Sequence, residues 1–153
     1  MNKLNDIMVS AALLWIGFTA SISFMEAWLK FRAKGVTIPI GLGIGRLVFG
    51  ALNKVEWLFS IMIILGFIYW FITGNQQNKN GIADLSFTFG LILFILIVET
   101  FWLLPGLDKR TRLIISGQTL PASSLHIYFI GVECIKIGVL FYFATQLFLF
   151  KQK

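Results

Sequence analysis

Residues 83–104 read ADLSFTFGLILFILIVETFWLL, an apolar run whose only charged side chains are Asp84 and Glu99. A helix needs about 20 apolar residues to cross the hydrocarbon core of a bilayer, so this run is long enough to span a membrane. It does not alternate strictly between apolar and polar residues, and a transmembrane strand has only about 10 residues, which favours a helix. Similar runs cover residues 7–29, 47–73 and 124–150. We therefore predict an all-α, integral membrane four-helix bundle that forms a single domain, residues 1–153.

The composition excludes most other classes of protein. Of the 153 residues, 58% are hydrophobic and only 13% are charged. A soluble domain has about 25% charged residues, so this chain cannot cover a water-facing globule, and it is too apolar to be disordered. Its single cysteine excludes a disulfide scaffold and a dithiol redox motif. The net charge of +6 is better explained by membrane orientation than by nucleic-acid binding, so the predicted partner is the lipid bilayer.

The segments between the runs carry turn and helix-stop signals. Residues 74–81 are polar and flanked by glycines, which predicts a loop. Pro105 and the glycine after it are predicted to stop the third span, and Pro39 is predicted to break any helix before the second span. A helix-like pattern runs over residues 43–73, which is about 45 Å of helix. We expect this helix to protrude from the membrane or to tilt, because the hydrocarbon core is about 30 Å thick.

The basic residues predict the orientation. Eight lie on the side of the first and third connections, and four lie on the side of the termini. The first group is Lys30, Arg32, Lys34, Arg46, Lys54, Lys109, Arg110 and Arg112, and the second is Lys3, Lys79, Lys151 and Lys153. Basic loops remain in the cytoplasm. We predict a multi-pass protein of the cell membrane with both termini outside the cytoplasm.

Each predicted span carries one glutamate, and the fourth span adds a histidine and a lysine. A charge at the centre of a bilayer costs about 2.5–3.5 kcal/mol on the insertion scale, so these side chains should face the bundle interior. The four glutamates fall in the half of each span predicted to be cytoplasmic, which suggests one shared depth. The predicted ion, proton or ligand site consists of Glu26, Glu56, Glu99, Glu133, His126, Asn53, Arg46 and Lys136.

Helical spacing supports this grouping. Arg46, Asn53 and Glu56 follow one stripe of the second span, and His126 lies seven residues before Glu133 on one face of the fourth. Lys136 lies within about 60° of Glu133 around that helix. Counter-ions for three of the carboxylates are predicted to be Arg46, Lys54 and Lys136.

Three functions fit this cluster. The preferred hypothesis is a small transporter or an ion- or proton-coupled membrane component, because intramembrane glutamate and histidine chains form proton relays. A bundle of this size has little room for a pore, so we expect such a transporter to be a homo-oligomer. The second is a membrane metalloenzyme, with Glu26, Glu56, Glu99, Glu133 and His126 as ligands for Fe, Mn or Zn. The third is a structural or assembly subunit held by ion pairs. Whether the protein is an enzyme therefore stays open.

Several short motifs resemble a known family. They are Trp15-Ile16-Gly17, the segment from Ala27 to Arg32 that ends the first span, residues 45–49, Pro105, and Leu125-His126. In order and spacing the chain is similar to the small four-span membrane proteins that include transmembrane protein 205 and its bacterial relatives of unknown function. Trp28 departs from the proline usual in that family, and Glu56, Glu99 and Glu133 are not mapped onto residues of that family. The resemblance implies a four-helix membrane architecture and no defined chemistry.

Overall fold

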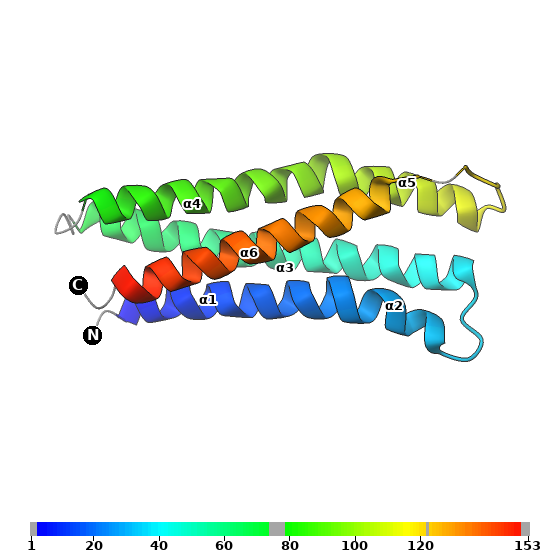
Figure 1. Ribbon diagram of the computed structural model, residues 1–153, viewed down its shortest axis with the longest axis horizontal. Coiled ribbons are helices and arrows are strands. Elements are labelled where there is room, and N and C mark those ends of the chain that lie inside the picture. Colours follow the sequence, from blue (N-terminus) through cyan, green and yellow to red (C-terminus); the bar gives the residue numbers. More distant parts are fainter. Residues whose placement is uncertain (1–2, 74–78, 122, 151–153) are drawn as a thin grey trace.

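The computed structural model of the chain describes residues 3–73, 79–121 and 123–150. Within these ranges every regular element is helical and no strand occurs. Four helical rods cover residues Lys3–Arg32, Ile38–Ile72, Gly81–Ile115 and Leu125–Phe150. Each rod is long and apolar enough to cross a membrane (Figure 1). The predicted all-α class and the number of long helices are confirmed.

Two of the rods change helical type along their length. The first comprises α1 (Lys3–Ala20), the π-helical turn η1 (Ser21–Glu26), α2 (Ala27–Leu29) and the 3₁₀ turn η2 (Lys30–Arg32). The second rod is α3 (Ile38–Ile72). The third comprises α4 (Lys79–Val98), the π-helical turn η4 (Glu99–Leu103) and α5 (Leu104–Ile115), and the fourth is α6 (Leu125–Phe150). Both π-helical turns therefore contain one of the glutamates singled out by the sequence.

Pro39 lies at the start of α3, one residue after its first residue, and does not prevent the helix. It lies in the first turn of α3, where a backbone N–H has no helical partner, so the missing N–H costs nothing. The chain break predicted here is confined to residues 33–37, where Gly35 adopts a positive φ of 84°. With 35 residues, α3 is about 52 Å long and exceeds the thickness of a hydrocarbon core even more than the sequence predicted.

The prediction that Pro105 stops the third span is wrong, because α5 continues through Pro105 to Ile115. A proline inside a regular helix clashes with the carbonyl four residues earlier and leaves a hydrogen bond unmade. Here the preceding turn is π-helical, and the N–H of Leu104 bonds to the carbonyl of Glu99, five residues back. The wider turn lets Pro105 enter at the first turn of α5 without ending the rod.

The predicted polar loop at residues 74–81 is only partly within the described chain. Residues 74–78 lie outside the described residues, and residues 79–81 form the start of α4. The fourth span agrees with its predicted range to within one residue at its start, since α6 begins at Leu125.

The four rods pack as a closed ring. α1 packs against α3 and α6, and α4 packs against α6 and more weakly against α3, while α5 packs against α3. In Figure 1, α6 crosses the bundle diagonally, and α1 begins at the same end at which α6 finishes. Near that end the core is apolar and aromatic: Phe67 contacts Trp70, Phe89 and Phe143 with ring centroids 5.6–6.3 Å apart.

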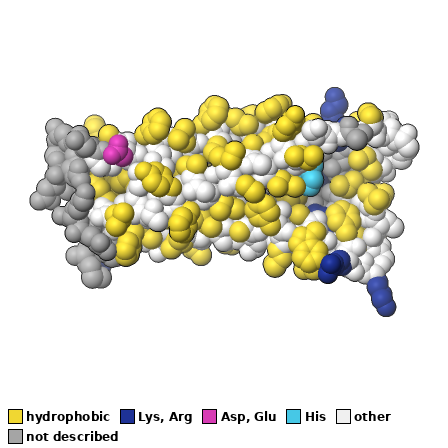
Figure 2. Space-filling view, in the orientation of Figure 1, with side chains coloured by type: hydrophobic (Ala, Val, Ile, Leu, Met, Phe, Trp, Pro, Cys, Tyr) yellow, Lys and Arg dark blue, Asp and Glu magenta, His cyan; other side chains and the backbone are white. Residues whose placement is uncertain are grey.

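The outer surface of the bundle is apolar. Phe71 is 90% exposed and Leu47 and Phe101 are each 73% exposed, and many other large apolar side chains lie on the outside. Figure 2 shows hydrophobic side chains over much of the described part of this face, with lysine and arginine gathered at the end where α3 begins. An apolar exterior of this extent is compatible with a membrane bundle.

Candidate functional site

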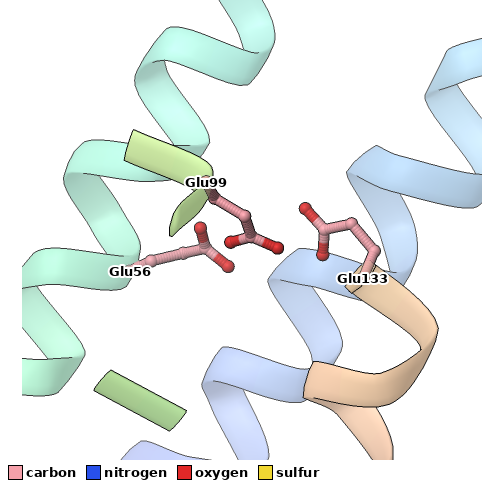
Figure 3. A group of neighbouring side chains, drawn as sticks. All are labelled: Glu56, Glu99 and Glu133. Carbon is pink, nitrogen blue, oxygen red and sulfur yellow. The ribbon is translucent and has the colours of Figure 1, made fainter. Parts of the chain in front are cut away.

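Three of the four predicted glutamates meet inside the bundle. Glu56 of α3, Glu99 of η4 and Glu133 of α6 each offer a carboxylate oxygen, and these atoms lie within 4.8 Å of one another. Figure 3 shows the three side chains pointing toward a common centre. None is more than 2% exposed. We call these three residues the carboxylate triad.

The members of the triad also share a depth. They lie 16 to 18 residues from Ile72, Gly81 and Phe150, the ends of their rods on the side of the termini. At 1.5 Å per residue, all three are about 24–27 Å from that end of the bundle. Side chains at one depth on three different helices can converge, whereas the same residues at scattered depths could not.

Lys136 of α6 lies at the centre of the triad. Its Nζ atom is 2.6 Å from Oε1 of Glu56, 2.5 Å from Oε2 of Glu99 and 3.2 Å from Oε2 of Glu133. The lysine side chain is fully buried. Three ionised carboxylates around one ammonium would carry a formal charge of −2. No other lysine or arginine pairs with the triad within the described part of the chain.

The three carboxylates differ in the number of hydrogen-bond donors that contact them. Oε1 of Glu56 accepts hydrogen bonds from the indole N–H of Trp15 and from the hydroxyl of Thr19, both 3.0 Å long. Both donors are buried on α1, one helical turn apart. Together with Lys136, they place three donors on one oxygen, which stabilises an ionised carboxylate in a fixed position.

Glu99 and Glu133 have fewer partners. Oε1 of Glu99 is buried and accepts no hydrogen bond from the residues that the structure describes. Glu133 has the longest contact to Lys136, and the hydroxyl of Ser23 lies beside its carboxylate. A buried polar atom without a partner costs about 1–3 kcal/mol, so these two side chains are the less stable members of the triad.

Two of the five predicted metal ligands lie apart from the triad. Glu26 pairs with Lys30 one turn along its own rod, at 3.2 Å, and its side chain is 24% exposed. His126 is exposed in the first turn of α6. It shares a face with Glu133, but seven residues separate them by about 10.5 Å along the axis, too far for both to bind one ion. The five-residue metal set predicted from the sequence is therefore not assembled.

Arg46 has a different partner from the predicted one. It forms an ion pair with Asp108, which also accepts a 2.9 Å hydrogen bond from Arg112. The reason is the continuation of the third rod past Pro105, which carries Asp108 alongside α3. Lys54, the other predicted counter-ion on that helix, is exposed. Of the three predicted counter-ions, only Lys136 pairs with the triad.

A second polar group lies beside the triad, on the same helices. The hydroxyl of Thr100 accepts hydrogen bonds from the side-chain amide of Asn53, at 2.9 Å, and from the indole N–H of Trp57, at 3.1 Å. The same hydroxyl donates to the carbonyl of Leu96. Sequence reasoning identified Asn53 but missed Thr100, although its position next to Glu99 in an apolar run was a usable signal. It also missed Trp15 as a donor.

Both π-helical turns lie at the site. η1 contains Ser23, which lies beside Glu133, and η4 begins at Glu99 itself. Such turns are rare and are often found at functional sites, because the extra residue re-aims the side chains around it.

Comparisons of this chain with protein families, curated proteins and solved structures found no match. The resemblance to four-span membrane proteins therefore stays a prediction.

Proposed function

We propose that this chain is a four-span integral membrane protein whose carboxylate triad and Lys136 form the exchange site of a small proton- or cation-coupled transporter. The membrane assignment is supported by the four long apolar helices and by the large apolar side chains on their outer faces. The excess of lysine and arginine near the first and third connections supports a cytoplasmic location for that end of the bundle.

The observation that carries the exchange function is the imbalance of charge. One ammonium balances the charge of one carboxylate, yet Lys136 forms ion pairs with three carboxylates. An uncompensated charge in a buried site costs several kcal/mol. The cluster is therefore stable only with bound protons or with an additional cation, and its charge changes whenever either one enters or leaves. A purely structural ion pair needs no such surplus of acid.

The triad divides into two roles on this proposal. Glu56 is the fixed anion, because it accepts from Trp15 and Thr19 as well as from Lys136. Glu99 and Glu133 take up and release the proton or cation, since their carboxylates have fewer donors. Lys136 supplies the internal positive charge that holds the unloaded site together.

Proton flux through proteoliposomes tests this function. The purified protein is reconstituted, a proton gradient is imposed, and the internal pH is followed with a trapped dye. We expect flux above that of empty liposomes, and a loss of at least tenfold in Glu99→Gln and in Glu133→Gln. Glu26→Gln is the matched control, because Glu26 pairs outside the triad and should leave the flux unchanged. Circular dichroism and gel filtration identify variants that fail to fold.

Flux that survives both triad substitutions would refute proton exchange at this site. Repeating the assay with sodium or potassium gradients distinguishes a proton from a metal cation as the transported ion. Chemical cross-linking of the reconstituted protein tests the proposed homo-oligomer.

A bound divalent metal is the second candidate function. It is favoured by the three carboxylate oxygens within 4.8 Å, an all-oxygen set that suits a hard divalent cation such as Mn or Mg. Lys136 occupies the centre of that set, so a metal would have to displace its ammonium. Metal analysis of the purified protein decides this case. A stoichiometric metal that is lost in Glu99→Gln would favour a metal centre, whereas absence of both metal and flux would leave the structural ion-pair network.

A further inference from the structure

A cleft lies beside the triad, between α3 and α5. Its volume is about 360 Å³, and its polar lining consists of Arg46, Asn53, Thr100, Asp108 and Thr111. The remaining walls include Phe49 and Leu104. A water molecule in the liquid takes up about 30 Å³, so the cleft has room for on the order of ten waters. Polar side chains give those waters partners, which an apolar cavity would not.

One part of the cleft lies within a helical turn of two triad members. Asn53 and Thr100 line this part and are joined by their 2.9 Å hydrogen bond. Thr100 directly follows Glu99, and Asn53 lies three residues before Glu56. Glu99 is also the triad member with a buried oxygen that no described residue bonds. We call Asn53 and Thr100 the floor of the cleft.

The opposite part of the cleft lies toward the basic end of the bundle. Arg46 and Asp108 line it and pair across it, one from α3 and the other from α5. Their side chains are 39% and 31% exposed, so both reach solvent. An ion pair at this position can hold the two helices together while leaving polar surface for water around it. We call this pair the mouth of the cleft.

We propose that the cleft is a hydrated vestibule through which protons reach Glu99 from the basic end, passing the Arg46–Asp108 pair and then the Asn53–Thr100 floor. This inference rests on the proposed exchange function and adds the route and the side of entry. The hydrogen bond between Asn53 and Thr100 lies between the cleft and the triad. On this proposal a proton passes either along the Thr100 hydroxyl or through the space opened when the Asn53 amide moves away from that hydroxyl.

Cysteine accessibility tests the vestibule. Cys134 is exposed, so the variants are made in a Cys134→Ser background. Thr100→Cys places a thiol on the floor, and Phe101→Cys is the matched control, because Phe101 is the next residue and is 73% exposed on the outside. Each variant in sealed vesicles is treated with a charged, membrane-impermeant methanethiosulfonate. We expect Thr100→Cys to react at least tenfold faster than Phe101→Cys, and only from the basic side.

Asn53→Cys provides a second floor position in case Thr100→Cys fails to fold. If neither floor thiol reacts faster than the Phe101→Cys thiol, the vestibule is refuted. Proton flux without preferential modification would retain exchange at the triad and remove this route to it. Preferential modification without any flux in the unmodified protein would leave a water-filled cleft but refute its role as a proton route. Labelling of the floor that also lowers the flux severalfold supports both proposals.

Discussion

The interiors of the two halves of the bundle contain different kinds of side chains. Toward the end where α1 begins and α6 finishes, the interior contains apolar and aromatic side chains such as Trp70, Phe89 and Phe143. Toward the basic end, the interior contains the carboxylate triad, Lys136 and the floor of the cleft. Both halves are held by the same four rods. The difference separates the part that packs the bundle from the part in which chemistry can take place.

The two halves should also differ in how well they tolerate amino-acid substitutions. An apolar core loses stability in proportion to the volume and contacts removed, and conservative exchanges cost little. A buried charge cluster depends on its balance, so one removed partner leaves the others uncompensated. Substitutions in the two halves should therefore differ both in their cost and in whether a second substitution can restore what the first removed.

The largest effect is expected for Lys136→Met. Among the residues that the structure describes, it removes the one cation paired with the triad, and breaking a buried pair costs about 3–5 kcal/mol. Unfolding in mixed micelles should show this loss. Adding Glu56→Gln, Glu99→Gln and Glu133→Gln to the same chain removes all three stranded carboxylates and should restore most of the stability. A single variant as stable as the natural protein would show that Lys136 does not balance the triad.

A smaller loss is expected for Thr100→Val, which keeps the side-chain shape and removes the hydroxyl. Asn53 and Trp57 then lose their acceptor, at a cost of about 1–3 kcal/mol in the free energy of unfolding. Thr145→Val is the control, because Thr145 is exposed and its hydroxyl donates to a carbonyl of its own helix. Equal stability of the two variants in the same micelles would contradict the role given to Thr100.

Phe143→Leu probes the apolar half. Phe143 is fully buried and contacts Phe67 and Phe89, and each aromatic pair contributes about 0.5–1.5 kcal/mol beyond its buried area. We expect a loss of about 1–2 kcal/mol, because leucine keeps part of the apolar contact. Proton flux in liposomes should remain unchanged. A large fall in flux from this conservative exchange would remove the functional distinction between the halves.

The smallest effect is expected for Arg112→Ala. Its side chain is 62% exposed, and its pair with Asp108 is a surface ion pair worth about 0–1 kcal/mol. Asp108 keeps Arg46 as a partner. The unfolding midpoint should therefore stay close to that of the natural protein. A loss as large as that of Lys136→Met would mean that burial is not what distinguishes the two ion-pair groups.

The sequence predicted the parts of the structure that depend on local pattern. Apolar run length gave the four helices, and one glutamate per run pointed to Glu56, Glu99 and Glu133. The spacing of Lys136 from Glu133 also placed the lysine near the site. These properties follow from helical geometry alone, because residues three apart on a helix lie on neighbouring positions of one face.

The rest depended on how the rods pack. Nothing in the spacing of Trp15 and Thr19 indicates that α1 turns them toward Glu56, since that contact crosses between helices. The partner of Arg46 was missed because Pro105 was interpreted as a stop signal, and a π-helical turn was not considered. His126 was included through its shared face with Glu133, although its distance along the axis keeps it out.

The π-helical turn η4 has a consequence for the register of the third rod. An extra residue in one turn rotates everything after it by about 100° relative to a regular helix. Deleting one residue within Glu99–Leu103 would let the rod return to a regular helix with the same facing, so Asp108 would remain opposite Arg46. The same residues in a regular helix would instead turn Asp108 away from Arg46, so the π-helical turn lets the rod contain one additional residue without losing that pair.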